Sequence, residues 1–323
     1  MLRRPALPLL LILLVLAGCG GSGDDKTASG ADTETQPAEK VEFPRGDDKT
    51  IRALRAERPE KAVFAPSVGT LRVGENRIGF ALFDVSRKQV TPEAVALYVA
   101  KPNGTGLRGP FEARKESLRV KPQFQSRQTQ ADLDDVDTFW VADVDFPKRG
   151  RYVVTALAQL DGELVSTSQF EMRAGPGGPP DIGDKAVKVD TDTPQDVGGN
   201  LAAIDTRLPP LPELHNTNFA DVLGKKPVVL AFATPQLCQT RVCGPVVDVV
   251  AEVRAEHEGD IDFIAQEIYV DNDINKGFRP QVGKWRLPTE PWTFVIGKDG
   301  KIVERFEGAV SVRELKAAVD KIS

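Results

Sequence analysis

Two cysteines placed between a strand-like run and a helix-like run constrain this chain more than any other feature. Cys238 and Cys243 are separated by four residues. The apolar run 228–233 leads into them and is typical of a buried strand. Pro245 suits the first turn of a helix, and the valines that follow it recur at helical spacing. The two sulfurs are therefore predicted to lie where a strand passes into a helix.

The length and charge of the chain bound its class. With 323 residues, it is long enough for two domains and their connecting segments. Its net charge is −5, and acidic and basic residues are well mixed along it. A nucleic-acid groove needs a basic stripe, and nothing in this sequence resembles one. We therefore expect no nucleic-acid partner.

The N-terminus carries the pattern of an export signal. Arg3 and Arg4 precede an apolar run over residues 6–16, which is too short for an ordinary membrane-spanning helix. The run ends in Leu-Ala-Gly followed by Cys19, which resembles the lipobox of bacterial lipoproteins. The resemblance implies that residues 1–18 are a signal peptide and that Cys19 is lipidated. It also implies an extracytoplasmic protein anchored to the membrane. The alternative is an ordinary signal peptide followed by a coincidental cysteine.

Lipidation of Cys19 leaves an even pair of cysteines in the mature chain. In an exported protein such a pair is competent to form a disulfide. Residues 19–60 are rich in small, polar and charged residues and poor in large apolar ones. Because such a segment cannot bury enough surface to fold, we predict that it is a disordered tether.

Residues 61–173 have the pattern of an all-β unit. Short runs alternate with period two, as in residues 78–83, and none has the length and spacing of an amphipathic helix. Asp161-Gly162, between two apolar runs, is typical of a hairpin turn. The turn before Tyr152 resembles the corner of a late strand in immunoglobulin-like sandwiches. We expect an immunoglobulin-like β-sandwich that spaces, docks or recruits.

A change of composition separates this unit from the rest of the chain. Residues 174–199 are rich in proline, glycine and polar side chains and are predicted to be a linker. Residues 200–323 then show the order strand, helix, strand, helix, strand, strand, helix. The strands are expected at 228–233, 261–270, 292–296 and 302–306, and the helices after Pro245, over 275–285 and from 311.

Two segments of this second unit resemble the membrane-anchored thioredoxin-like and redoxin proteins of bacteria. They are residues 219–235, ahead of the cysteines, and residues 290–303. The likeness covers about residues 195–323 and implies an α/β thioredoxin fold. In that family a cis proline precedes the hairpin strand and packs against the disulfide, and Pro291 stands in that place. The family usually has two residues between its cysteines, whereas this chain has four.

The resemblance also implies roles for the residues of the site. Cys243 fits the second, resolving thiol, which leaves Cys238 as the exposed nucleophile. Helix N-termini and neighbouring cations lower the pKa of a thiol, so Arg241 is expected to stabilise the thiolate. A substrate groove is expected beside Pro291 at Thr289, Glu290 and Trp292. Trp292 is also interpreted, with Trp285, as a packing residue.

The predicted function is that of a thiol-disulfide oxidoreductase acting on protein disulfides, without a metal or other cofactor. Its expected partners are the membrane, through Cys19, and a thiol or disulfide protein. The main alternative is a binding or assembly protein in which the bridge is structural. A peroxidase of the peroxiredoxin type would use Thr240 and Cys243. Such a protein is expected to have a proline about seven positions before that cysteine, and this chain has Gln236 there. A copper chaperone of the Sco type would need a histidine within 261–291, which has none.

The remaining candidate ligands are interpreted as solvated side chains. His215 and His257 are expected to be solvated rather than metal ligands. Four aspartates between the strands of the first unit are predicted to form a solvated loop rather than a metal site; they are Asp132, Asp134, Asp135 and Asp137.

Overall fold

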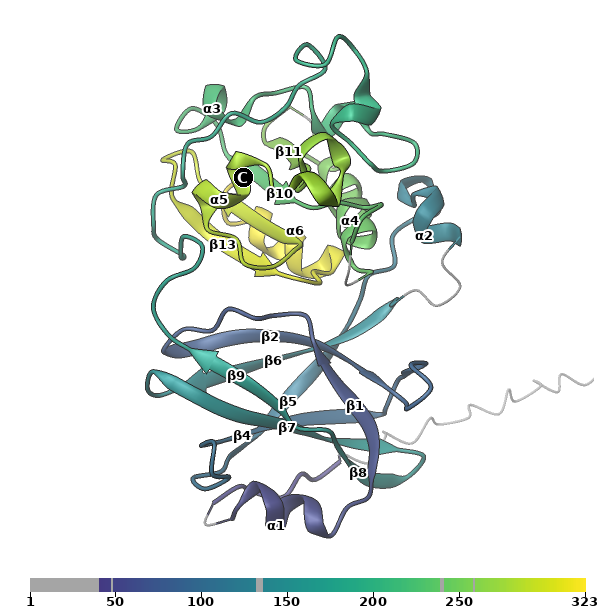
Figure 1. The fold of residues 1–323 in the computed structure, drawn as a ribbon, viewed down its shortest axis with the longest axis vertical. Helices are drawn as coiled ribbons and strands as arrows, with labels where there is room; N and C mark the ends of the chain where they lie inside the picture. Colours follow the sequence, from purple (N-terminus) through teal and green to yellow (C-terminus); the bar gives the residue numbers. More distant parts are fainter. Residues whose placement is uncertain (1–40, 48, 132–135, 239–240, 258) are drawn as a thin grey trace, which may run out of the picture. The chain divides into compact units, whose positions relative to one another are not determined.

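Nine of the strands pair into one sheet that closes on itself. The computed structural model describes residues 41–323 except 48, 132–135, 239–240 and 258 (Figure 1). The elements of this part are α1 (Ile51–Ala56), β1 (Glu60–Pro66), β2 (Gly74–Phe83), β3 (Gln89–Val90), β4 (Ala94–Ala100), β5 (Arg108–Ser117), η1 (Pro122–Phe124), α2 (Arg127–Ala131), β6 (Thr138–Phe146), β7 (Gly150–Leu160), β8 (Glu163–Thr167) and β9 (Phe170–Ala174).

Closure of the sheet comes from β1, which has a partner on each side. The strands follow the order β1-β8-β7-β4-β5-β6-β2, and β2 pairs again with β1, so seven strands make a closed barrel. β1 runs parallel to β8 and antiparallel to β2. Strands β3 and β9 extend the sheet beside β2 and β7. The inward side chains, Phe80 and Trp140 among them, form one apolar core.

The predicted immunoglobulin-like sandwich is therefore wrong. Alternating apolar residues place one face of each strand inside, and this holds for a barrel as much as for a sandwich. What separates the two folds is which strand closes the sheet, and period two carries no information about that. The hairpin turn was correctly predicted, because Asp161 and Gly162 join β7 to β8 with φ angles of 51° and 76°.

Part of the predicted tether is folded. Helix α1 begins after Thr50, whose hydroxyl accepts a hydrogen bond from the amide of Ala53. Ile51 and Leu54 are buried on this helix and pack in a cluster with Phe43 and residues of β4. Residues 41–323 make one compact unit.

The chain forms a second sheet of four strands, and the cysteines follow the first of these strands in sequence. Its strands have the order β11-β10-β12-β13, with β10 parallel to β11 and antiparallel to β12. The elements are η2 (Leu201–Ala203), η3 (Pro212–Leu214), α3 (Phe219–Val222), β10 (Val228–Phe232), α4 (Cys243–Arg254), β11 (Asp262–Gln266), η4 (Val270–Asn272), η5 (Ile274–Lys276), α5 (Pro280–Trp285), β12 (Trp292–Ile296), β13 (Ile302–Glu307) and α6 (Val312–Val319).

The predicted fold class is also wrong for the chain as a whole. The closed barrel holds most of the strands, and the four-stranded part does not make a clear α/β thioredoxin fold. Its second helix, expected over 275–285, has only the six residues of α5. Gly277 has a φ of 77°, and Pro280 forces the residue before it into an extended conformation, so a helix cannot begin earlier.

The final helix follows its sequence signal closely. The Ser311 hydroxyl accepts from the amide of Glu314, and the Glu314 carboxylate accepts from the amide of Ser311. This capping box satisfies two amides that the first turn would leave unpaired. α6 then packs its apolar face in a core shared with α4.

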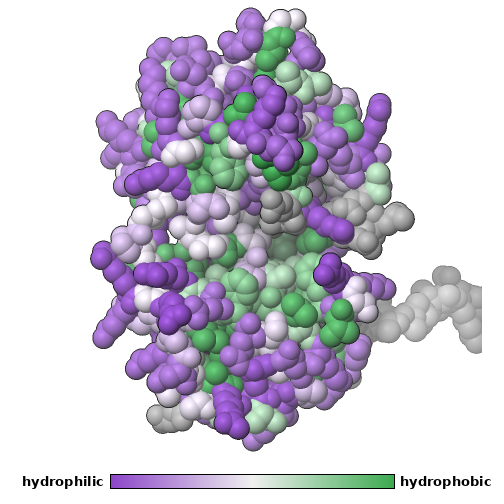
Figure 2. Space-filling model, viewed as in Figure 1, coloured by the Kyte–Doolittle hydropathy of each residue, from purple (hydrophilic) through white to green (hydrophobic). Residues whose placement is uncertain are grey.

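The face drawn in Figure 2 is largely hydrophilic, with smaller hydrophobic areas between. Among the large apolar side chains that are exposed, Phe278 is 62% accessible. Within the described ranges, no helix has both the length and the apolar character needed to cross a membrane. The predicted signal peptide and Cys19 lie outside the described residues.

Candidate functional site

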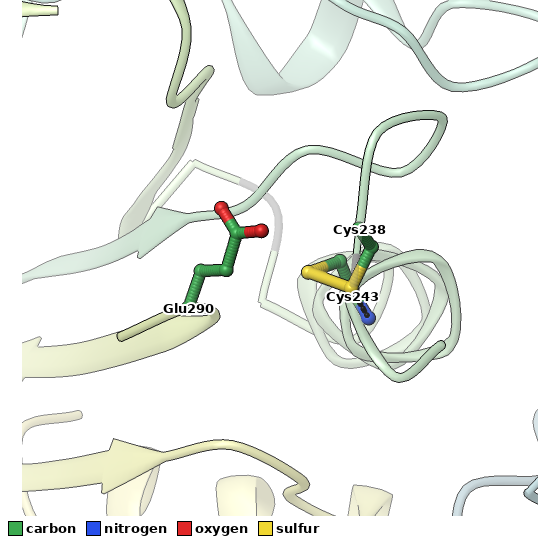
Figure 3. A group of neighbouring side chains, drawn as sticks. All are labelled: Cys238, Cys243 and Glu290. Atoms are coloured by element: carbon green, nitrogen blue, oxygen red, sulfur yellow. Dashed lines mark hydrogen bonds between the residues drawn. A yellow bond between two sulfur atoms is a disulfide. The ribbon is translucent and has the colours of Figure 1, made fainter. Parts of the chain in front are cut away.

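The two cysteines form a disulfide at the start of α4 (Figure 3). Cys238 lies in the turn after β10 and is partly exposed, whereas Cys243 is the first residue of α4 and is 0% accessible. Their Cα atoms are 5.9 Å apart. Pro245 occupies the first turn of α4, where its missing amide costs no helical hydrogen bond. The predicted passage from strand to helix is confirmed at this point.

The N-terminus of α4 forms a hydrogen bond with the sulfur of Cys238. The amide of Cys243 donates a hydrogen bond to Sγ of Cys238 over 3.3 Å. An amide at the start of a helix of 12 residues carries the positive end of the helix dipole. After reduction the same amide favours a thiolate over a thiol at Cys238. Arg241 is exposed with a φ of 61°, and its role in stabilising the thiolate stays a prediction.

A carboxylate lies beside the disulfide. One carboxylate oxygen of Glu290 and the sulfurs of Cys238 and Cys243 all lie within 4.8 Å of one another. In Figure 3 the Glu290 side chain points toward the sulfurs from the segment before β12. The peptide bond from Glu290 to Pro291 is cis, as expected, and Pro291 is buried. Its carbonyl accepts a hydrogen bond from the amide of Gly308 over 2.9 Å.

The residues of the predicted groove are tied to the rest of the fold. Trp292 is 1% accessible and stacks on Phe294 with ring centroids 5.6 Å apart, so its interpretation as a packing residue is confirmed. Its indole Nε1 donates to Oγ1 of the exposed Thr289 over 3.1 Å. That hydroxyl donates to Oε1 of Glu307 over 2.5 Å. Trp285 is likewise fully buried. The groove itself stays a prediction.

Sequence reasoning missed a buried polar network behind the cysteines. Asp248 is 0% accessible on α4, and its carboxylate accepts from Nε of Arg207 over 3.0 Å. It also accepts from the amide of Ser126 and the hydroxyl of Thr129, over 2.9 and 2.8 Å. Burial raises the pKa of Asp248 despite these donors. A single aspartate within a run of valines is the sequence signal for such a site.

One histidine prediction is wrong. His215 is 1% accessible, and its Nε2 lies 3.4 Å from Oδ2 of the buried Asp205. The cause is packing with a distant strand, because η3, which ends just before His215, contacts β11. His257 is partly exposed and stacks on Phe263. Asp137 binds Arg119, and the other three aspartates of its predicted loop lie outside the described residues.

Glu267 gives a testable pH dependence. Burial raises its pKa, although its Oε1 accepts bonds from the amide and hydroxyl of Thr206, both over 2.7 Å. The ordinary pKa of a glutamate carboxyl is 4.5, and the unfolded chain releases the Glu267 proton above that pH. The folded chain keeps this proton to a higher pH. The protonated Glu267 carboxyl therefore stabilises the fold fully below pH 4.5. This stabilisation is lost as the pH rises through the pKa of Glu267 in the folded chain.

We expect Glu267→Gln to remove this loss, because the amide does not titrate. Urea unfolding of the wild type and the variant, measured from acid to neutral pH, gives the two slopes of stability against pH. The variant should fall less steeply than the wild type. Glu213→Gln, at an exposed position on η3, is the matched control and should keep the wild-type slope. Parallel curves for Glu267→Gln and the wild type would contradict the assignment.

Comparisons with known proteins give only weak structural neighbours. No family model and no curated protein matches this chain. One similar solved structure is a thiol:disulfide interchange protein of the thioredoxin family from Chlorobium tepidum TLS. It is 12% identical, covers 46% of this chain and 99% of its own, and has a TM-score of 0.31. Another is the Lin-41 filamin domain, 13% identical, with coverages of 36% and 95% and a TM-score of 0.20. Neither assigns the chain to a family.

Proposed function

We propose that this chain is a lipid-anchored, extracytoplasmic thiol-disulfide oxidoreductase that acts on protein disulfides. The observation that carries the proposal is the asymmetry of the pair. Cys238 is partly exposed, and its sulfur accepts a hydrogen bond from the first amide of α4. Cys243 is fully buried. An accessible sulfur that is stabilised as a thiolate is suited to attack, and a buried neighbour is suited to resolution.

The cycle begins with the reduced pair. The Cys238 thiolate attacks one sulfur of a partner disulfide, and the second partner sulfur leaves as a thiolate. Cys243 loses its proton and attacks Sγ of Cys238, which releases the first partner sulfur as a thiolate. Two electrons have then passed to the partner, and the Cys238–Cys243 disulfide is restored. The reverse sequence oxidises a partner dithiol.

The membrane anchor and the compartment are part of the same proposal. They are supported by the lipobox-like sequence that ends in Cys19. A disulfide between Cys238 and Cys243 is consistent with an oxidising environment outside the cytoplasm.

Equilibration with glutathione redox buffers tests the proposal. The fraction of oxidised protein is read after acid quenching and alkylation of free thiols. We expect a reversible transition with a potential between about −270 and −120 mV, the range of known exchange proteins. A bridge that resists reduction throughout this range would instead favour the structural role. A loop of this length adds little stability by chain entropy, which weakens that alternative.

A further inference from the structure

We infer that the reduced cysteine pair and Glu290 form a binding site for a single zinc ion. The site does not depend on the proposed function, because it requires only that the bridge can be reduced. An external dithiol supplies two electrons and two protons to the disulfide and is itself oxidised to a disulfide. Binding of Zn²⁺ by both thiolates then releases two protons, with no change in the oxidation state of the metal.

The ligand set fits zinc better than other common metals. Zinc is bound in proteins by thiolate sulfur and carboxylate oxygen in tetrahedral geometry, and an open site has three protein ligands and a water. Copper(I) prefers soft ligands, and the carboxylate oxygen is not one. Magnesium and calcium prefer oxygen ligands alone, so the two sulfurs do not suit them. The two cysteines and Glu290 supply the three protein ligands.

The spacing of the ligand atoms is close to what the ion needs. With Zn–S bonds of about 2.3 Å, two sulfurs of a tetrahedral site lie about 3.8 Å apart. The three ligand atoms already lie within 4.8 Å of one another, and opening the S–S bond lets the sulfurs separate. The segment before β12 supplies Glu290, the turn after β10 supplies Cys238 and the start of α4 supplies Cys243, so the three ligands come from three places in the fold.

The surroundings also favour binding. The amide of Cys243 that donates to Sγ of Cys238 lowers the cost of ionising that thiol. Cys238 and Glu290 are both partly exposed, which gives an ion a path to the buried Cys243. A bound ion would occupy both thiolates, so zinc and a partner disulfide would compete for the reduced protein.

Cobalt(II) is the spectroscopic probe for this site. The full-length chain carrying Cys19→Ser is kept in detergent and reduced with a phosphine, so that neither a third thiol nor a thiol reductant binds metal. Cobalt is added without oxygen, and the thiolate-to-cobalt absorbance is recorded. We expect saturation at one cobalt per chain, displacement of cobalt by one equivalent of zinc, and no such absorbance from the oxidised protein.

Variants separate the proposed ligands from general charge effects. Glu290→Gln keeps the shape of the side chain and should weaken binding about tenfold or more, as loss of a metal-site residue does. Cys238→Ser should abolish the saturating signal. Glu213→Gln changes the net charge by the same amount at an exposed site outside the cluster and should bind as the wild type does. Absence of a saturable signal, or unchanged affinity in Glu290→Gln, would overturn the inference.

Discussion

Replacing Cys243 with serine is expected to trap partner proteins on Cys238 as stable mixed disulfides. The nucleophile remains accessible, but the buried thiol that releases the partner is gone. Resolution must then wait for an external thiol, which lacks the effective concentration of a positioned neighbour. Turnover of a model disulfide should therefore fall by about 100-fold or more. Adducts are measured on non-reducing gels and disappear on reduction.

Three variants make this trapping experiment decisive. Cys238→Ser should form no adducts, because the serine hydroxyl does not attack disulfides. The double variant Cys238→Ser/Cys243→Ser gives the background. Cys19→Ser removes the third thiol and should leave trapping by Cys243→Ser intact when the protein is purified. If Cys243→Ser yields no adducts where a trapping variant of a known exchange protein does, the bridge is structural. Adducts on Cys243 in the Cys238→Ser variant would reverse the assigned roles.

The sequence predicts the parts of the site that depend on neighbouring residues. Five consecutive buried residues make β10, and helical spacing of valines makes α4, so the place of both sulfurs between these elements follows from local patterns alone. The cis bond before Pro291 is expected from the resemblance and is present. These features are local, and each has a pattern of its own in the chain.

The features that were missed depend on contacts between distant residues. Closure of the barrel rests on β1 pairing with both β2 and β8. The alternation of apolar residues along a strand does not predict which strands pair. The carboxylate of Glu307 accepts hydrogen bonds from the amides of Gly69 and Thr70, over 2.7 and 3.0 Å. Glu307 is 238 positions from Gly69 and 237 from Thr70 in the sequence. The burial of His215 depends in the same way on packing rather than on its own sequence neighbours.

These contacts connect the barrel to both sides of the cysteine site. On one side, Glu307 joins the β1–β2 connection to Thr289, two residues before Pro291. Gly308, with a φ of 72°, lies so close to Ser67 that a side chain there would collide with it. On the other side, the connection from β5 to β6 reaches α4 through Asp248. The barrel therefore supports both elements that hold the site.

Asp248→Ala is expected to cause the largest loss of stability among single substitutions of buried polar residues near the site. The change leaves the buried guanidinium of Arg207 without its carboxylate, and the amide of Ser126 without its acceptor. Removing one partner of a buried ion pair typically costs about 3–5 kcal/mol. Against a total stability of about 5–15 kcal/mol, such a loss would be visible directly in the midpoint of urea unfolding.

The paired variant Asp248→Ala/Arg207→Met distinguishes an unpaired charge from a loss of packing. If the cost arises from the buried guanidinium, replacing it with an apolar side chain should recover part of the lost stability. Glu256→Ala breaks ion pairs of the exposed Glu256 with Lys316 and Lys121, and should cost less than about 1 kcal/mol. A loss in Asp248→Ala no larger than in Glu256→Ala would show that the connection from the barrel does not hold α4 through this carboxylate.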